Sequence, residues 1–96
     1  MRPSVAFNSH KQAIKYIVEQ NHACNARIFG SVLHGNDTDN SDLDLLIEPT
    51  IETTLMDIAR IQNKLQALLG IHVDVLTPKA LPESFRNQVL KEAKPI

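Results

Sequence analysis

The chain has 96 residues and a mass of 10.7 kDa, which is enough for one domain, residues 1–96, built around a single core. Hydrophobic residues make up 43% and charged residues 22%, a composition that is typical of a globular protein and excludes a disordered or fibrous chain. The net charge of −1, without a run of Lys or Arg, disfavours an extended nucleic-acid-binding surface, because such a surface needs clustered cations.

The single cysteine, Cys24, excludes an internal disulfide and a cysteine-based zinc site. We expect it to act as a small hydrophobic residue, buried or half-buried. The first seven residues lack the apolar segment of a signal peptide, and no stretch approaches the roughly 18 apolar residues of a membrane span. We therefore expect a cytoplasmic protein with no membrane partner.

The N-terminal half alternates helical and strand patterns. The predicted elements are a helix over residues 8–22, a strand over 26–29, a helical turn over 31–36 and a strand over 42–47. Asn8 or Ser9 is the expected N-cap of the first helix.

The C-terminal half holds the clearest helix. Thr54 and Asp57 form a capping-box pattern at its start, and Gly70 ends it. The apolar residues predicted to form its buried face are Leu55, Ile58, Ile61, Leu65, Leu68 and Leu69. A strand over 71–76 and a last helix over 79–93 follow. The order α-β-α-β-α-β-α predicts an α/β (α+β) fold with a small sheet, in which the long helix crosses over between the second and third strands.

A Gly-Ser corner, Gly30-Ser31, lies where the first strand meets the helical turn. Glycine lets the backbone approach a ligand closely, and the serine N–H and hydroxyl suit phosphate oxygens. Such a corner is most often a simple turn, so its interpretation depends on the acidic residues that follow.

Asp42 and Asp44 enter the second strand two residues apart. Residues at this spacing point to one face of a strand, so both carboxylates aim at one spot while Leu43, Leu45 and Ile47 bury on the other side. Two like charges this close are unfavourable unless a cation neutralises them. Exposed aspartates at a strand edge also occur without a ligand, but the nearby Gly-Ser corner favours a metal site. Oxygen ligands favour Mg²⁺ or Mn²⁺ over zinc.

Asp74 lies in the third strand, on the same face as His72 and Leu76. A charged residue within a Val/Leu strand is costly unless it is paired or bound to a metal. If the second and third strands are neighbours, Asp74 lies beside Asp42 and Asp44, and three carboxylates can hold two metal ions for phosphoryl transfer. Asp74 can also accept the proton of the attacking hydroxyl, and His72 is a candidate contact to nucleotide or metal.

The remaining polar residues near these motifs favour a simpler interpretation. Asp and Asn are common in turns, where they are exposed to water. We therefore expect solvated or surface positions for Asp37, Asp39, Asn40, His10, His22 and His34, and a structural or rim charge at Arg27.

Three segments together resemble the minimal nucleotidyltransferases (MNT) of the DNA polymerase β-like superfamily: Gly30-Ser31, Ser41-Asp42-x-Asp44-Leu45-Leu46-Ile47 and Val73-Asp74-Val75. The similarity runs from about Ala26 to the end of the chain. The resemblance implies a mixed-sheet catalytic palm that binds a nucleoside triphosphate and two Mg²⁺ ions, or Mn²⁺ in their place. It also implies that Gly30 and Ser31 hold the β- and γ-phosphates, Asp42 and Asp44 the metals, and Asp74 one metal and the incoming hydroxyl.

The resemblance further implies an activity, the transfer of AMP from ATP to a protein hydroxyl with release of pyrophosphate. Small members of this family are commonly encoded beside a HEPN-domain partner. There they act as antitoxins that adenylylate a tyrosine of the HEPN ribonuclease toxin. We therefore expect ATP as a substrate and a HEPN-domain toxin as the partner.

One segment departs from the family pattern. Many relatives carry a Gly-Ser-Arg-Ala-Arg-Gly-like run, whereas this chain has Val32-Leu33-His34-Gly35 after the Gly-Ser pair. The change removes guanidinium groups that bind phosphate in a bidentate manner. Two alternatives therefore remain open: a non-catalytic module that neutralises its partner by contact, and a nucleotidyltransferase that acts on a small molecule or nucleic acid.

Overall fold

A four-stranded mixed sheet forms the centre of the protein in the computed structural model, which describes residues 1–96. The strands are β1 (Ala23–Phe29), β2 (Leu43–Pro49), β3 (Val73–Leu76) and β4 (Lys94–Pro95), in the spatial order β3-β2-β1-β4. β1 pairs antiparallel with β2 and β4, whereas β2 and β3 run parallel. The helix between β2 and β3 crosses over the sheet, as predicted, because parallel neighbours cannot be joined by a tight turn.

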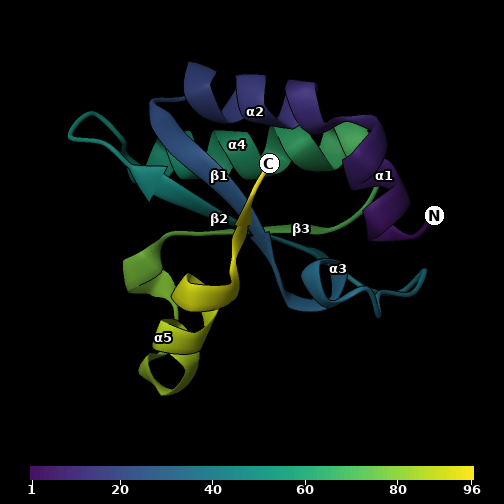
Figure 1. Ribbon diagram of the computed structural model, residues 1–96. Helices are drawn as coiled ribbons and strands as arrows, with labels where there is room; N and C mark the ends of the chain where they lie inside the picture. The colour runs from purple at the N-terminus through teal and green to yellow at the C-terminus, as the bar shows by residue number, and fades with distance from the viewer.

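Helices cover the sheet unequally (Figure 1). The helices are α1 (Pro3–Ser9), α2 (Lys11–Gln20), α3 (Gly30–His34), α4 (Leu55–Leu69) and α5 (Glu83–Glu92), with a 3-10 turn, η1 (Pro78–Ala80), before α5. α2 and α4 pack side by side over one face, while α5 lies on the opposite side of the sheet. No helix combines the length and the apolar character that crossing a membrane requires.

The alternation of β2 divides the core into two parts. Leu43, Leu45 and Ile47 are fully buried in the larger cluster, beneath α2 and α4. Leu46 points the other way, into a small cluster with Phe29 and Leu81. Asp44 shares the Leu46 face because strand residues two apart lie on one side of the sheet. The predicted separation of acidic and apolar residues along this strand is therefore confirmed.

The predicted first helix over residues 8–22 corresponds to α2, but its N-cap is His10 rather than Asn8 or Ser9, and a preceding helix, α1, was not predicted. α1 begins earlier, with Pro3 in its first turn, and ends at Ser9. His10 has non-helical backbone angles, φ −131° and ψ 22°, and separates α1 from α2. Its Nδ1 lies 2.9 Å from the Ala6 carbonyl oxygen. His10 is half-buried rather than an exposed helix residue. Asn8 and Ser9, which are residue types typical of N-caps, instead form the end of α1.

The predicted boundaries of β1, and the predicted burial of Cys24, need correction. β1 begins at Ala23, three residues before the predicted strand, and contains a register shift between Cys24 and Arg27. Asn25 within this irregular part has a positive φ of 50°. Cys24 is exposed, because it alternates with the buried Ala23 and lies on the outer face of the strand.

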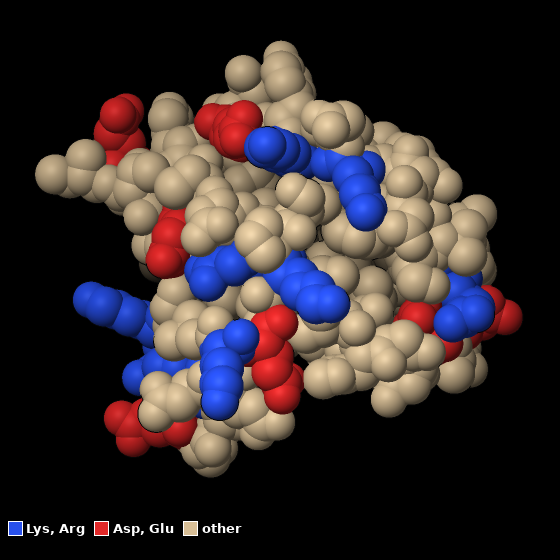
Figure 2. Space-filling view, viewed as in Figure 1, with Lys and Arg blue, Asp and Glu red and all other residues tan.

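The C-terminal region differs from the single helix predicted over 79–93. Pro82 separates η1 from α5, because a proline disfavours helical backbone in the residue before it. The chain then adds β4, a two-residue strand beside β1 that was not predicted. On the face of the molecule seen in Figure 2, Lys and Arg side chains are interspersed with Asp and Glu.

The capping box of α4 is confirmed. Thr54 Oγ1 accepts a hydrogen bond from the Asp57 N–H at 3.1 Å, and Asp57 Oδ2 accepts one from the Thr54 N–H at 2.9 Å. The predicted apolar face is too wide, however: Leu55 is 85% exposed and Leu68 is 39% exposed. The fully or nearly buried residues of the stripe are Ile61, Leu65 and Leu69, spaced four residues apart.

Asp37 is buried, which contradicts its prediction as a solvated loop residue. Asp37 Oδ2 accepts a hydrogen bond from the Ser4 N–H at 2.9 Å, and the Arg2 guanidinium donates to Oδ1 at 3.2 Å. The hydrogen bond from Ser4, with the Arg2 cation, lowers the pKa of Asp37, although burial opposes this. The contact ties the start of α1 to the loop before β2. Its neighbour Asp39 is exposed, as predicted.

Candidate active site

The parallel pairing of β2 with β3 brings four polar residues into a square on one face of the sheet. The register pairs Leu43 with Val73 and Asp44 with Asp74. Asp42 therefore lies opposite His72, and the Leu43 N–H donates to the His72 carbonyl at 3.0 Å. We call Asp42, Asp44, His72 and Asp74 the acidic square. The predicted neighbourhood of Asp74 with Asp42 and Asp44 follows from this register.

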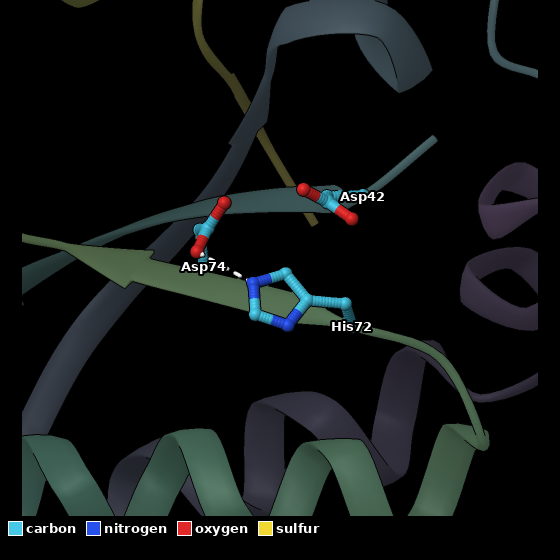
Figure 3. A group of neighbouring side chains, drawn as sticks. All are labelled: Asp42, His72 and Asp74. Atoms are coloured by element: carbon cyan, nitrogen blue, oxygen red, sulfur yellow. Dashed lines mark hydrogen bonds and ion pairs between the residues drawn. The ribbon is translucent and has the colours of Figure 1, made fainter. Parts of the chain in front are cut away.

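Three corners of the acidic square offer ligand atoms at short range. One oxygen or nitrogen each of Asp42, His72 and Asp74 lies within 4.8 Å of the other two. Figure 3 shows Asp42, just before β2, on the same side as His72, just before β3, and Asp74 within β3; His72 Nε2 lies 3.0 Å from Asp74 Oδ1. Asp42 and His72 are exposed and Asp74 is half-buried, so a ligand can reach all three from solvent.

The fourth corner, Asp44, lies against the Gly-Ser corner. Gly30 has φ +73°, and a Cβ built there would collide with Asp44 Oδ2. Only glycine accommodates both the positive φ and this close approach. Ser31 follows as the second residue of α3, half-buried beside the same turn. The Gly-Ser motif and the aspartate motif are thus in direct contact.

The carboxylates of the acidic square lie close enough to repel one another. Burial raises the pKa of Asp44 to about 6, and the nearby carboxylates of Asp74 and Asp42 add to the increase, with a smaller opposing effect of His72. A bound divalent cation relieves such repulsion by favouring the ionised carboxylates. The carboxylate oxygens and the accessible position fit Mg²⁺ or Mn²⁺, and His72 adds one nitrogen donor.

The segment after the Gly-Ser corner supplies no strong phosphate donor. Val32 is buried, and His34 Nε2 lies 3.2 Å from Glu92 Oε2 on α5. His34 is exposed, as predicted, and already has a carboxylate partner. A groove of about 280 Å³ lies between Gly30 and α5, and Phe85 and Val89 of α5 line one side of it.

Two other predicted positions can be placed. Arg27 is half-buried on β1, and its Nη2 lies 3.5 Å from Glu48 Oε2. This agrees with a structural charge. His22 is exposed, with φ 66°, and its Nδ1 lies 3.3 Å from Asp57 Oδ2. Neither residue belongs to the acidic square.

The family model for polymerase beta, nucleotidyltransferase, matches residues 11–96. The chain belongs to this family. It is therefore a nucleotidyltransferase, and the resemblance stated from the Gly-Ser and aspartate motifs is confirmed. The match begins at the first residue of α2, so α1 lies outside it.

Individual relatives agree with this assignment. The candidate protein adenylyltransferase MJ0435 of Methanocaldococcus jannaschii is 33% identical over 86 residues, which are 90% of this chain and 92% of the relative. The protein adenylyltransferase MntA of Thermococcus cleftensis is 31% identical over 65 residues, or 68% of this chain and 66% of that protein.

Solved structures match the fold closely. A structure of a candidate minimal nucleotidyltransferase superposes with a TM-score of 0.86 and 35% identity, covering 97% of this chain and 95% of the other. A crystal structure of a toxin–antitoxin with AMP-PNP gives a TM-score of 0.74 at 21% identity, covering 88% of this chain and 70% of the other, and shows likeness of fold alone. The predicted mixed α/β palm is confirmed.

Proposed function

We propose that this protein is a Mg²⁺-dependent protein adenylyltransferase that transfers AMP from ATP to a tyrosine hydroxyl of a HEPN-domain ribonuclease toxin and thereby acts as its antitoxin. The observation that carries the proposal is the convergence of Asp42, Asp44 and Asp74 on one face, with Asp44 against Gly30. Relatives named as protein adenylyltransferases, one of them 33% identical along nearly its whole length, support a protein as the acceptor.

Each residue has a defined role in this proposal. Asp42 and Asp44 hold the metal ions, and Asp74 binds one of them and faces the acceptor hydroxyl. Gly30 and Ser31 hold the β- and γ-phosphates through the backbone of the turn and the serine hydroxyl. When bound, the metal ions neutralise the negative charge that develops on the phosphate oxygens.

The reaction is a single displacement at the α-phosphorus of ATP. The acceptor oxygen forms a bond to the α-phosphorus as the bond from that atom to the bridging oxygen of the β-phosphate breaks. Pyrophosphate leaves with the electron pair of the broken bond, and Asp74 accepts the hydroxyl proton. The product is a tyrosine joined to AMP through a phosphodiester.

The experiment incubates the protein with ATP labelled at the α-phosphate, Mg²⁺ and a HEPN-domain toxin from the same genome. We expect label on the HEPN protein, and a loss of about 100-fold or more with Asp42→Asn or Asp74→Asn, because each change removes charge stabilisation of the transition state. Asp39→Asn is the matched control, since Asp39 is an exposed aspartate outside the acidic square. Absence of label with the wild type, equal label with Asp42→Asn, or label on RNA or a small molecule instead would contradict the proposal.

A second candidate is neutralisation by contact alone. It is favoured by the segment after the Gly-Ser corner, where Val32 is buried and His34 pairs with Glu92 instead of providing a guanidinium. A double variant, Asp42→Asn with Asp74→Asn, that still protects cells from the HEPN toxin as well as the wild type would favour this second function. Loss of protection would favour catalysis.

A further inference from the structure

One corner of the acidic square is an imidazole rather than a carboxylate. His72 occupies the position opposite Asp42, directly before β3, as Asp74 occupies the position opposite Asp44. In Figure 3 its ring lies beneath the gap between Asp42 and Asp74 and turns Nε2 toward Asp74. The side chain is 54% exposed, so a ligand can reach its ring from solvent.

The spacing of the donor atoms matches that of ligands on one cation. Two ligands at about 2.1 Å from a metal and at right angles to one another are separated by about 3.0 Å. His72 Nε2 and Asp74 Oδ1 are separated by 3.0 Å, and an Asp42 oxygen completes a group within 4.8 Å. A cation bound by all three would therefore replace the present His72–Asp74 hydrogen bond with bonds to the metal.

We propose that His72 Nε2 is an inner-sphere ligand of the cation held by Asp42 and Asp74, and that this nitrogen makes the site prefer Mn²⁺ over Mg²⁺. The inference rests on the proposed function in that Asp42 and Asp74 bind a divalent metal. Mg²⁺ prefers oxygen ligands and retains its water, whereas imidazole binds first-row transition metals well. A single nitrogen among oxygen ligands therefore adds affinity for Mn²⁺ and little for Mg²⁺.

The direct test is pulsed electron paramagnetic resonance of Mn²⁺ bound to the tag-free, nucleotide-free protein. We expect a modulation from a coordinated ¹⁴N nucleus in the wild type and its loss in His72→Gln. His34→Gln is the matched control, because His34 is an equally exposed histidine that pairs with Glu92 on α5. We expect this variant to keep the nitrogen signal.

Calorimetric titration with Mn²⁺ and Mg²⁺ provides the second measurement. We expect His72→Gln to weaken Mn²⁺ binding by about tenfold or more and Mg²⁺ binding by roughly threefold or less, so that the preference for Mn²⁺ falls. Circular dichroism checks that the variant is folded.

The outcomes separate this inference from the proposed function. Mn²⁺ binding that depends on Asp42 and Asp74 but gives no nitrogen signal overturns the role of His72 and leaves the carboxylate site intact. An unchanged Mn²⁺ to Mg²⁺ preference in His72→Gln also overturns it. Mn²⁺ binding that is insensitive to both Asp42→Asn and Asp74→Asn contradicts the metal site itself, and with it the proposed function.

Discussion

The carboxylate of Asp44 occupies the space into which any side chain at position 30 would have to project, so Gly30 and Asp44 form one contact. The glycine stands where β1 turns into α3, and the aspartate stands on the neighbouring strand β2. The turn proposed to hold phosphate and the carboxylate proposed to hold metal are therefore positioned by the same packing.

Replacing Gly30 with alanine tests this contact. Gly30→Ala is expected to push Asp44 out of place and to lower kcat/KM for labelled AMP transfer by about 100-fold, since small displacements of catalytic groups have effects of this size. Gly35→Ala is the control: it has nearly the same φ, +75°, but nothing lies within 4 Å of its Cβ. Both variants bear the same backbone strain, so equal losses of activity would contradict the role of the Gly30–Asp44 contact.

The raised pKa of Asp44 predicts that ionisation of this carboxyl lowers the stability of the metal-free protein. A carboxyl whose pKa rises from 3.8 to about 6 on folding lowers stability as pH increases through that interval, and the loss is complete above about 6. Asp44→Asn cannot ionise. With chelator present, it is expected to melt at a higher temperature than the wild type at pH 7.5, and the difference should shrink as pH falls from 6 toward 4. A difference that is constant with pH would contradict this explanation.

The buried contact of Asp37 with the start of α1 predicts the opposite pH dependence. Because the pKa of Asp37 is lowered on folding, its contribution is present above the ordinary value of 3.8 and is lost as pH falls through the folded-state pKa. Asp37→Asn is expected to lower the melting temperature by several degrees at pH 7 and to have little effect in strong acid. Asp39→Asn, two residues away and paired only with the N-terminal amine at 3.8 Å, should leave the melting temperature unchanged.

Two leucines of α4 are expected to differ sharply in their contribution to stability. Leu65 is fully buried, so Leu65→Ala should cost about 2–5 kcal/mol of unfolding free energy by urea denaturation. Leu55 is 85% exposed at the start of the same helix, and Leu55→Ala should change this free energy by less than about 0.5 kcal/mol. Similar losses of unfolding free energy for both variants would contradict the exposed position of Leu55.

Much of the fold follows from local signals in the sequence. The capping box of Thr54 and Asp57 fixed the start of α4, because both of its hydrogen bonds are made within one turn. The alternation of Asp44 with buried Leu43 and Leu45 likewise predicted which face of β2 carries charge. Placing Asp74 beside Asp44 needed one further inference, that a long helix between two strands brings them into parallel contact.

Non-local contacts account for what the sequence did not reveal. The burial of Asp37 depends on Arg2 and Ser4, which lie at the start of α1, 35 and 33 positions earlier in the sequence. The exposure of Cys24 depends on its place in β1, which begins at Ala23, three residues before the predicted strand. His72 carried a usable signal, since it alternates with Asp74, but its position opposite Asp42 required the strand register.

The crossover through α4 has a consequence for folding. β1 and β2 can pair as soon as the chain reaches Pro49, and at that stage Asp42 and Asp44 repel only each other. The 15-residue helix α4 must fold back across the sheet before β3 can add His72 and Asp74. The electrostatic repulsion and the metal-binding capacity therefore arise together when β3 docks against β2. Because the complete acidic square exists only once β3 has docked, a divalent cation bound to it should slow unfolding more than it speeds folding.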